Sequence, residues 1–510
     1  MHRELFLDEV SIAHMEGLRR TLHQPQRHPA NPVVPADRPW ENMASVYGTT
    51  IYDAAAGQFR MWYLIGCPSD GEFTDEQTGA RHPLPQTTRV GYAESADGVT
   101  WHKPELGQLE WRGSTANNML ALGRQNPEGI SVLVDEGDPD ATLRSAYSAE
   151  VASATKAGSG TSLRPLRPPK RDFVAREGGS TRPARRYKAL FWDHAADGAW
   201  VHPELKCVLW KETAGDGAYL AWSADGIHWT QAPESPVISQ YMDTNQNLLW
   251  DPRLKRYVAF SRFGFGRKIA RSESADFAHW EQPRLVLDCD ERDGEGTQFY
   301  GAGIDLYEGL YVAMLWVYRE GGDGCIDTQL GVSRDGVHWE RVADRQVFLP
   351  LGEPGSWEDG MARAAERIIH VGDRLYIYYS GVNGPHSGPK FPPDTIVRKH
   401  KPAIGLATLR RDGFVSLDAA AREGWLLTHP FHLPRGRLHL NLDARGGQCA
   451  VGLCEEEGHP IPGFEKSRTI AGDATDVEVT WPHPVAPPVG RSVTLRISLE
   501  RAALYSYWFE

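Results

Sequence analysis

The sequence has few of the residues that would make a metal site, a disulfide framework or a membrane span. It contains six cysteines, and no two form a Cys-x-x-Cys pair, so neither a zinc site nor a redox motif is predicted. Their wide scatter is not that of a disulfide framework. No apolar run approaches the ~18 residues of a membrane-spanning helix. The first residues, MHRELFLDEVSIAHMEG, contain no apolar signal-peptide region. We therefore expect a cytoplasmic protein without a membrane partner.

Positive charge is also scarce. The formal net charge is -12, which argues against a nucleic-acid partner because such a partner requires a concentrated basic face. Neither a Gly-x-Ser-x-Gly motif nor a glycine-rich nucleotide loop occurs between a strand and a helix, which excludes the corresponding hydrolase and nucleotide-cofactor classes. No loop has a calcium-binding pattern, although a hydrated Ca²⁺ in a tunnel would need few protein oxygens. We expect no cofactor and no metal.

One seven-residue phrase recurs along the chain. It reads SADGVTW up to Trp101, SADGIHW up to Trp229, SADFAHW up to Trp280 and SRDGVHW up to Trp339, and a degraded copy, RRDGFVSL, surrounds Asp412. Asp-Gly between two strand-like runs is a strong hairpin signal, because a type I′ turn needs positive φ at both central positions. Each copy therefore predicts a β-hairpin, and in the first four the returning strand carries a structural tryptophan.

A second hairpin is predicted upstream of each phrase. An apolar strand, a tight turn and an aromatic strand follow one another in residues 47–65, 186–200, 247–262, 300–319 and 367–381. Two hairpins per repeat give four antiparallel strands, and tandem four-stranded sheets are typical of propeller blades. The sequence thus predicts an all-β fold with a five-bladed β-propeller. The alternative is a β-sandwich with unrelated Asp-Gly turns.

Two segments fall outside this repeat. Residues from about 153 to 186 are rich in Gly, Ser, Pro and Arg and predict a flexible insertion in the second blade. The alternative for this segment is a basic phosphate-binding arm. Strict alternation with Gly-Gly and Glu-Gly turns after residue 422 predicts a β-sandwich. We expect a propeller over residues 1–422 and a sandwich over residues 423–510, which either supports the propeller or binds carbohydrate.

Taken together, these segments resemble the five-bladed propeller glycoside hydrolases of the invertase and arabinanase type. Within that superfamily the chain looks most like the group described as glycosyl hydrolase family 32 N-terminal domain-like. The segments that carry the resemblance are LHQPQRHPANPV, PWENMASVYGTTIYD, YAESADGVTWHKPELG, WDPRLKRYVAFSR, GTQFYGA, GSWEDGM, IGLATLRRDGFVSLDA and GHPIPGF. The resemblance implies a propeller followed by a sandwich, and activity on a carbohydrate. However, the Asn-Asp-Pro-Asn-Gly, Arg-Asp-Pro and Glu-Cys motifs of the invertase-like enzymes are missing, so no catalytic role can be transferred by motif.

Candidate catalytic residues therefore come from the geometry expected of a propeller. Acidic residues at the entries of the innermost strands would converge at one end of the central tunnel. Glycoside hydrolysis needs one protonated carboxyl group as acid and one carboxylate as base or nucleophile. We predict Glu358 as the acid and Glu41 or Asp243 as the base or nucleophile. Each of them, taken singly, also fits a solvated loop residue or a turn cap.

Sugar recognition requires flat apolar faces and polar groups that reach hydroxyls. The residues near the predicted strand entries and exits that could supply these contacts are Trp40, Tyr47, Asp135, Asn245, Glu295, Gln298, Tyr300, Trp357, Asp359, Arg363 and His386. For each aromatic residue, packing between blades is the alternative.

The function predicted from these residues is a glycoside hydrolase that cleaves a small oligosaccharide or glycoside, such as a furanoside. The distance between the two carboxyl groups would decide between inversion and retention. A phosphorolytic relative would need a cluster of Arg and Lys at the site, and the sequence shows no obvious cluster. The alternatives are a carbohydrate-binding propeller without catalysis and an interaction scaffold. The oligomeric state and the sugar are not predicted.

Overall fold

The computed structural model describes residues 3–75, 78–123, 126–135, 185–193, 199–201, 208–210, 215–239, 245–262, 267–387, 390–392, 395–482 and 486–510. Its regular elements are strands, apart from two short 3-10 helices, η1 (Glu291–Asp293) and η2 (Val342–Arg345). The prediction of an all-β protein is therefore confirmed. In this part of the chain no helix is long and apolar enough to cross a membrane.

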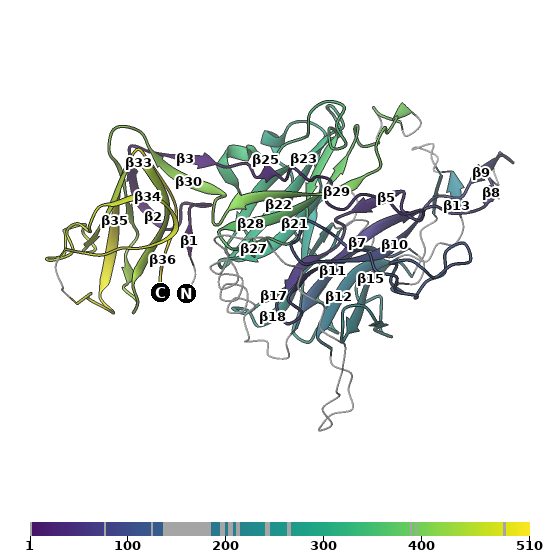
Figure 1. Ribbon diagram of the computed structural model, residues 1–510, viewed down its shortest axis with the longest axis horizontal. Helices are drawn as coiled ribbons and strands as arrows, with labels where there is room; N and C mark the ends of the chain where they lie inside the picture. The colour runs from purple at the N-terminus through teal and green to yellow at the C-terminus, as the bar shows by residue number, and fades with distance from the viewer. Residues whose placement is uncertain are drawn as a thin grey trace, which may run out of the picture.

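Three antiparallel sheets of four strands form the first part of the larger body in Figure 1. The first contains β5 (Met43–Ser45), β6 (Thr50–Asp53), β7 (Gln58–Cys67) and β10 (Thr87–Ser95). The second contains β11 (Glu128–Val134), β12 (Tyr187–Asp193), β15 (Gly217–Ser223) and β16 (Trp229–Gln231). The third contains β17 (Asn247–Asp251), β18 (Arg256–Arg262), β19 (Ile269–Ser274) and β20 (Arg284–Leu287). Two ribbons accompany them, β8 (Glu72–Thr74) with β9 (Arg81–Pro83) and β13 (Ala199–Val201) with β14 (Val208–Trp210).

Two further groups of strands share one larger sheet. The first group contains β21 (Thr297–Tyr307), β22 (Leu310–Arg319), β23 (Ile326–Ser333), β24 (Glu340–Arg341) and β25 (Val347–Leu349). The second contains β26 (Met361–Ala364), β27 (Ile369–Val371), β28 (Arg374–Val382), β29 (Ala403–Arg410) and β4 (Gln26–Arg27). The groups are joined by one parallel register between Ile326 and Met361. Because β4 comes from near the N-terminus, the last group is completed by the beginning of the chain.

Each of these groups of strands contacts the next, and the last contacts the first. Strand β11 contacts β7, β17 contacts β11, β21 contacts β17, β26 contacts β21, and β5 contacts β28 and β29. Side chains bridge the neighbours: the backbone N–H of Leu248 donates to Ser131 Oγ at 2.8 Å, and that of Val46 donates to Ser380 Oγ at 2.8 Å. Such bonds satisfy backbone donors where one sheet meets the next. A five-bladed propeller is the interpretation that agrees with these contacts, and it stays a prediction.

The remaining sheet draws strands from both ends of the chain. It contains β1 (Glu4–Leu5), β2 (Ile12–Glu16), β3 (Leu18–Leu22), β30 (Val415–Ala419), β31 (Gly424–Thr428), β32 (Phe431–His432), β33 (Leu438–Cys454), β34 (Ile470–Glu478), β35 (Ser492–Glu500) and β36 (Ala502–Phe509). In Figure 1 this sheet lies at the left with both termini. Residues 4–22 and 415–419 thus share a sheet with residues 424–509. The predicted domain boundary near residue 422 and the C-terminal sandwich stay predictions.

Asp412, from the degraded fifth copy of the phrase, lies where the sheet that contains β1 and β36 meets the other sheets. Its side chain is fully buried and accepts hydrogen bonds from Tyr307 Oη at 2.6 Å and Ser506 Oγ at 2.6 Å. It also pairs with Arg3 at 3.0 Å. These partners come from β21, β36 and the N-terminus. One carboxylate therefore fastens three distant parts of the chain.

The intact copies of the phrase form a wider loop than predicted. In the second copy Ser223 pairs with Trp229, which leaves residues 224–228 in the loop. Gly226 has φ 77°, whereas Asp225 does not have a positive φ. Instead, Asp225 Oδ1 accepts the two backbone N–H groups that follow Gly226, each at 2.8 Å. The hairpin is confirmed, but the type I′ turn is wrong, because the Asp side chain closes the loop in place of a second left-handed residue.

The loop of each phrase also contacts the preceding sheet or, for the first sheet, the last. The carbonyl oxygen of Gly226 accepts a hydrogen bond from Trp62 Nε1 of β7 at 2.7 Å. That of Gly98 accepts from Tyr378 Oη of β28 at 2.5 Å. The repeated phrase therefore joins neighbouring sheets as well as turning a hairpin.

One predicted hairpin is not formed as expected. Residues 186–200 were expected to hold both strands of the hairpin, but β12 pairs with β11 on one side and β15 on the other, while β13 pairs with β14. The reason is that the strand preceding β12 lies before the inserted segment, at residues 128–134. Most of the predicted insertion at 153–186 lies outside the described residues.

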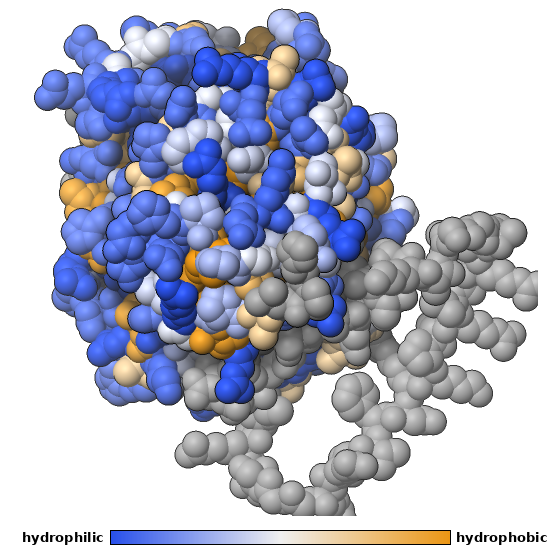
Figure 2. Space-filling view, turned by 90° about the vertical axis from the view of Figure 1, so that its left-hand side faces the viewer, coloured by the Kyte–Doolittle hydropathy of each residue, from blue (hydrophilic) through white to orange (hydrophobic). Residues whose placement is uncertain are grey.

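The left-hand side of the molecule in Figure 1, which faces the viewer in Figure 2, is mainly hydrophilic. Hydrophobic residues occur there as separate small areas between blue side chains. Scattered apolar residues are normal for a protein surface. No broad apolar area is visible among the described residues on this face.

Candidate functional site

Glu41, a predicted base or nucleophile, lies in a buried ion pair. Its Oε2 is 2.6 Å from Lys103 Nζ, and its Oε1 accepts a hydrogen bond from Tyr63 Oη at 2.7 Å. The backbone N–H of Arg38 donates to Oε2 at 3.2 Å. Burial and the adjacent Glu41 raise the pKa of Tyr63 well above its usual value. Both carboxylate oxygens are therefore engaged in contacts that hold the first sheet together.

Glu358, the predicted acid, is also buried and paired. Its Oε1 accepts a hydrogen bond from Arg27 Nε at 2.8 Å, and Arg27 in turn donates to the carbonyl oxygen of Pro350 at 2.6 Å. Burial and the neighbouring Glu358 raise the pKa of Tyr379. The carboxyl group thus faces β4 and β28, in the last sheet. Its catalytic role stays a prediction.

The expected pair of catalytic carboxylates stays a prediction. Glu41 and Glu358 have separate partners, and the described residues show no contact between them. Asp243, the third candidate, lies outside the described residues. Trp40 donates from Nε1 to Asn118 Oδ1 at 2.9 Å, and Trp357 stacks on Tyr379 at 5.9 Å between ring centroids. Both tryptophans thus pack within the protein beside the respective acids.

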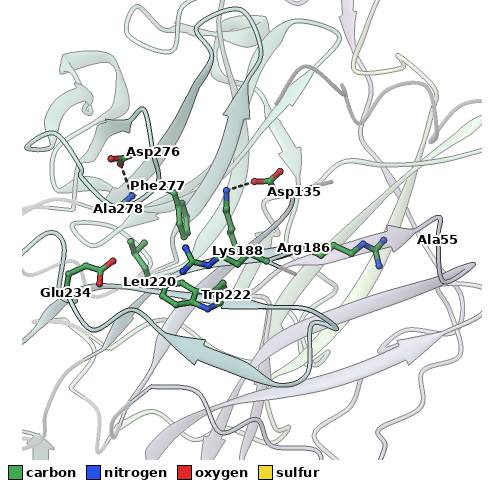
Figure 3. A pocket seen from close by; sticks show the side chains of 11 residues that line it. Ala55, Asp135, Arg186, Lys188, Leu220, Trp222, Glu234, Asp276, Phe277 and Ala278 are labelled. Atoms are coloured by element: carbon green, nitrogen blue, oxygen red, sulfur yellow. Dashed lines mark hydrogen bonds and ion pairs between the residues drawn. The ribbon is translucent and has the colours of Figure 1, made fainter. Parts of the chain in front are cut away.

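Asp135 lies at the other end of its strand from that predicted. It follows the last residue of β11, accepts a hydrogen bond from Tyr257 Oη at 3.1 Å and pairs with Lys188. The expectation that it marks a strand entry is wrong, because β11 begins seven residues earlier, at Glu128. Figure 3 shows it beside a cavity of about 600 Å³. The cavity is lined by Ala55, Asp135, Arg185, Arg186, Lys188, Leu220, Trp222, Glu234, Asp276, Phe277 and Ala278.

Three other predicted residues have different surroundings. Asp359 accepts backbone N–H groups of Gly355 and Gly384, each at 2.7 Å. Burial opposes ionisation of Asp359, but these donors outweigh it and lower its pKa. Asn245 is buried and donates from Nδ2 to the carbonyl oxygen of Ala302 at 2.5 Å. Glu295 is exposed in the loop before β21. Asp359 and Asn245 therefore order the backbone around them.

Five predicted binding residues do converge, around Tyr300. Arg363 NH1 donates to Tyr47 Oη at 2.7 Å, and its guanidinium lies 5.8 Å from the Tyr300 ring centroid. His386 Nε2 is 3.1 Å from Tyr300 Oη. Gln298 is linked to the group by Arg267, which lies 5.4 Å from the Tyr300 ring centroid. They come from the β5–β6 loop, β21, β26 and the segment after β28. We call the Tyr300 cluster the set Tyr47, Arg267, Gln298, Tyr300, Trp316, Tyr318, Glu320, Arg363 and His386.

Four members of the Tyr300 cluster were missed by the sequence reasoning: Arg267, Trp316, Tyr318 and Glu320. Glu320 Oε2 accepts a hydrogen bond from Gln298 Nε2 at 2.6 Å, and its Oε1 lies 3.3 Å from Arg267 NH1. Gln298 at the start of β21 pairs with Tyr318 at the end of β22. Strand exits lie beside strand entries in an antiparallel sheet. Reading the exit of the aromatic strand LYVAMLWVYRE for acids would have found Glu320.

Histidine 386 is uncharged in this cluster. Burial, followed by the positive charge of Arg267, lowers the pKa of His386 to about 3. Its Nδ1 lies 2.5 Å from the carbonyl oxygen of Ser387, which can only accept, so Nδ1 carries the proton. Nε2 then accepts the hydrogen bond from Tyr300 Oη. This fixes the orientation of the Tyr300 hydroxyl group.

The Tyr300 cluster combines aromatic faces, amide and hydroxyl groups, guanidinium groups and one carboxylate. Such a set suits a polyhydroxylated ligand, because ring faces contact C–H groups while polar atoms reach hydroxyls. Among the described residues there is no group of three or more His, Cys, Asp or Glu side chains that could hold a metal ion.

Comparisons with known proteins give distant similarities only. No family model matches the chain, and no curated protein matches it. Among solved structures, an exo-inulinase from Aspergillus awamori is 12% identical with a TM-score of 0.41, covering 96% of this chain and 99% of that one. A β-1,2-mannobiose phosphorylase from Listeria innocua is 11% identical with a TM-score of 0.41, covering 76% of this chain and 96% of that one. A glycosyl hydrolase from Bacteroides ovatus is 12% identical with a TM-score of 0.43, covering 76% and 94%. Similarities at this level carry no argument about activity.

Proposed function

We propose that this chain is a carbohydrate-active enzyme, a five-bladed β-propeller with a C-terminal β-sandwich, that binds a small sugar at the Tyr300 cluster. The observation that carries the proposal is the meeting of four residues around one aromatic ring, from the β5–β6 loop, β21, β26 and the segment after β28: Tyr47, Tyr300, Arg363 and His386. The contacts that close the five groups of strands on themselves support the propeller.

The proposed reaction is cleavage of a glycosidic bond in a small oligosaccharide or glycoside, furanosides included. Such a reaction needs a carboxyl group that donates a proton to the leaving oxygen. Glu320 is the carboxylate of the Tyr300 cluster, and its side chain is 26% exposed, so it can reach a ligand. We assign Glu320 as the proton donor in place of Glu358, because the Glu358 side chain is only 6% exposed. Asp243 remains the sequence-predicted base or nucleophile.

The proposal is tested with a panel of aryl glycosides and short oligosaccharides. We expect Glu320→Gln to lose about 100-fold or more in kcat, the usual size of a general-acid contribution. The matched control is Glu291→Gln, an exposed carboxylate in η1, which should keep full activity. A loss in Glu358→Gln with an unaffected Glu320→Gln would return the acid role to Glu358. Absence of turnover on every substrate would contradict an enzyme.

The second candidate is a carbohydrate-binding protein without catalysis. It is favoured by the ion pair of Glu41, whose two carboxylate oxygens both have partners, and by that of Glu358, whose Oε1 is bound by Arg27. Calorimetric titration separates the two functions. Sugar binding that Tyr300→Ala abolishes, together with no turnover of the bound sugar, would support the binding protein.

A further inference from the structure

Arg363 has an incompletely balanced charge. Arg363 is 5% exposed, and among the described residues it makes one hydrogen bond, to Tyr47 Oη at 2.7 Å. Within the same part of the chain its Nε has no hydrogen-bond partner. Among the described residues no carboxylate forms an ion pair with it. A buried guanidinium without a counter-charge is costly, because the lost hydration is not replaced by an equally strong interaction.

The aromatic residues around Arg363 position its charge without neutralising it. The guanidinium lies 5.0 Å from the Tyr47 ring centroid, 5.6 Å from that of Trp316 and 5.8 Å from that of Tyr300. Cation–π contacts of this kind are weaker than a charge-assisted pair. They hold the guanidinium plane in place and leave Nε without a hydrogen-bond partner among the described residues.

Arg267 and Arg398 are two of the arginine residues near Arg363. Arg267 contacts the rings of Tyr300 and Tyr318, at 5.4 and 5.1 Å, and its Nε likewise has no hydrogen-bond partner in the part of the chain that the structure describes. Arg398 donates to the carbonyl oxygens of Gly384 and Pro385, at 3.3 and 3.0 Å. Burial, followed by the charge of Arg363, lowers the pKa of Arg398.

Negative charge near these three guanidinium groups is limited. Glu320 forms an ion pair with Arg267 at 3.3 Å. Asp359 is already bound by backbone N–H groups. In the described part of the site the positive charges therefore outnumber the negative ones. The arginine cluster that the sequence did not show is formed by side chains far apart in the chain.

We propose that Arg363 and Arg267 bind an oxyanion, a carboxylate, sulfate or phosphate group, beside Tyr300. Guanidinium groups match such anions because two N–H groups can donate to two oxygens. The anion is either carried by the carbohydrate or supplied as free inorganic phosphate. This inference rests on the proposed function, since it names a chemical group recognised at the same site.

The test measures dissociation constants by calorimetry at constant ionic strength, for inorganic phosphate, sulfate, glucuronate and glucose. The proteins are wild type, Arg363→Gln, Arg267→Gln and the control Arg112→Gln. Arg112 pairs with Asp70 on the surface, so its loss changes the net charge equally, away from the site. We expect at least one oxyanion to bind wild type and the control equally, and to bind the two site variants at least tenfold more weakly.

The ligands distinguish the two sources of the anion. Phosphate or sulfate that binds without sugar, and competes with glucuronate, indicates a site for a free anion. Glucuronate that binds while phosphate does not indicates a carboxylate carried by the sugar. Should Arg363→Gln fail to fold, the more exposed Arg267→Gln decides the question.

The inference and the proposed function fail separately. Equal oxyanion affinity in wild type and both site variants, or no oxyanion binding at all, overturns the oxyanion site. Neutral sugars could still bind and be turned over in that case, which would leave the proposed function intact. Arginine-dependent phosphate binding without binding of any carbohydrate would keep the oxyanion site and contradict the proposed function.

Discussion

The Nζ of Lys103 lies 2.6 Å from Oε2 of Glu41, and the two side chains are 4% and 0% exposed. The pair is completed by Asp37, whose Oδ1 is 2.8 Å from the same Nζ. Lys103 follows the first copy of the repeated phrase, so the pair fastens that hairpin to the segment before β5. This relationship gives Glu41 a structural contact, while its catalytic role stays a prediction.

Lys103→Met is expected to lower the free energy of unfolding by about 3–5 kcal/mol, because it leaves a buried carboxylate without its counter-charge. Glu41→Gln should cost less, since Asp37 still pairs with Lys103 and the amide oxygen still accepts from Tyr63. Urea denaturation of both variants measures the difference. Equal costs for the two would show that the ion pair is not the source of the stability.

Glu366 predicts a pH dependence of stability. It accepts hydrogen bonds from Ser131 Oγ at 2.6 Å and from Thr49 Oγ1, and burial raises its pKa from 4.5 to about 7. Between pH 4.5 and 7 the folded protein keeps a proton that the unfolded chain releases, so stability falls as pH rises. The change is about 3 kcal/mol, at ~1.36 kcal/mol for each pKa unit.

The measurement compares wild type with Glu366→Gln by urea denaturation across this pH range. The variant cannot titrate at this position, so the wild-type advantage should shrink steadily from pH 4.5 to 7. Glu291→Gln, which alters an exposed carboxylate, should follow wild type. A constant difference between wild type and Glu366→Gln would contradict the raised pKa.

Asp412 predicts the opposite pH dependence. Burial opposes its ionisation, but Arg3, Ser506 and Tyr307 outweigh burial and lower its pKa below 3.8. Its contribution to stability is therefore present above pH 3.8 and is lost as pH falls through the lower folded pKa. Asp412→Asn should cost about 3–5 kcal/mol at neutral pH and less in acid. Acid-induced unfolding at the same midpoint in both proteins would refute this.

Gly226→Ala tests the contact between the repeated loop and the preceding sheet. The glycine has φ 77°, and an added Cβ would lie 2.8 Å from Trp62 Cζ2. We expect a loss of about 2–4 kcal/mol, of which ~1–2 is backbone strain and the rest overpacking. Gly57→Ala is the matched control, with φ 65° and nothing within 4 Å of the added Cβ. Gly57→Ala should lose only the stability that backbone strain costs. Equal losses in the two variants would mean that Trp62 moves aside at no cost in free energy.

The hairpins and the all-β class follow from local patterns. Alternating apolar residues, Asp-Gly loops and aromatic strands are read within ten residues, and strand pairs such as β17–β18 formed where they were expected. The turn type could not be predicted, because the same Asp-Gly sequence fits a loop closed by the Asp side chain and a turn with two left-handed residues. For β12 the partner strand, β11, could not be predicted because the inserted segment separates the two in the sequence.

The sequence by itself determined the class of fold, the strands and the list of polar residues from which a site could be made. The tertiary structure alone decided which of them meet. Glu41 pairs with Lys103, which is 62 residues away in the sequence, and Glu358 pairs with Arg27, which is 331 residues away. Tyr47 and Arg363, which are hydrogen-bonded, are 316 residues apart. Such partners are set by how the sheets pack, and a buried charge takes whichever counter-charge that packing brings within reach.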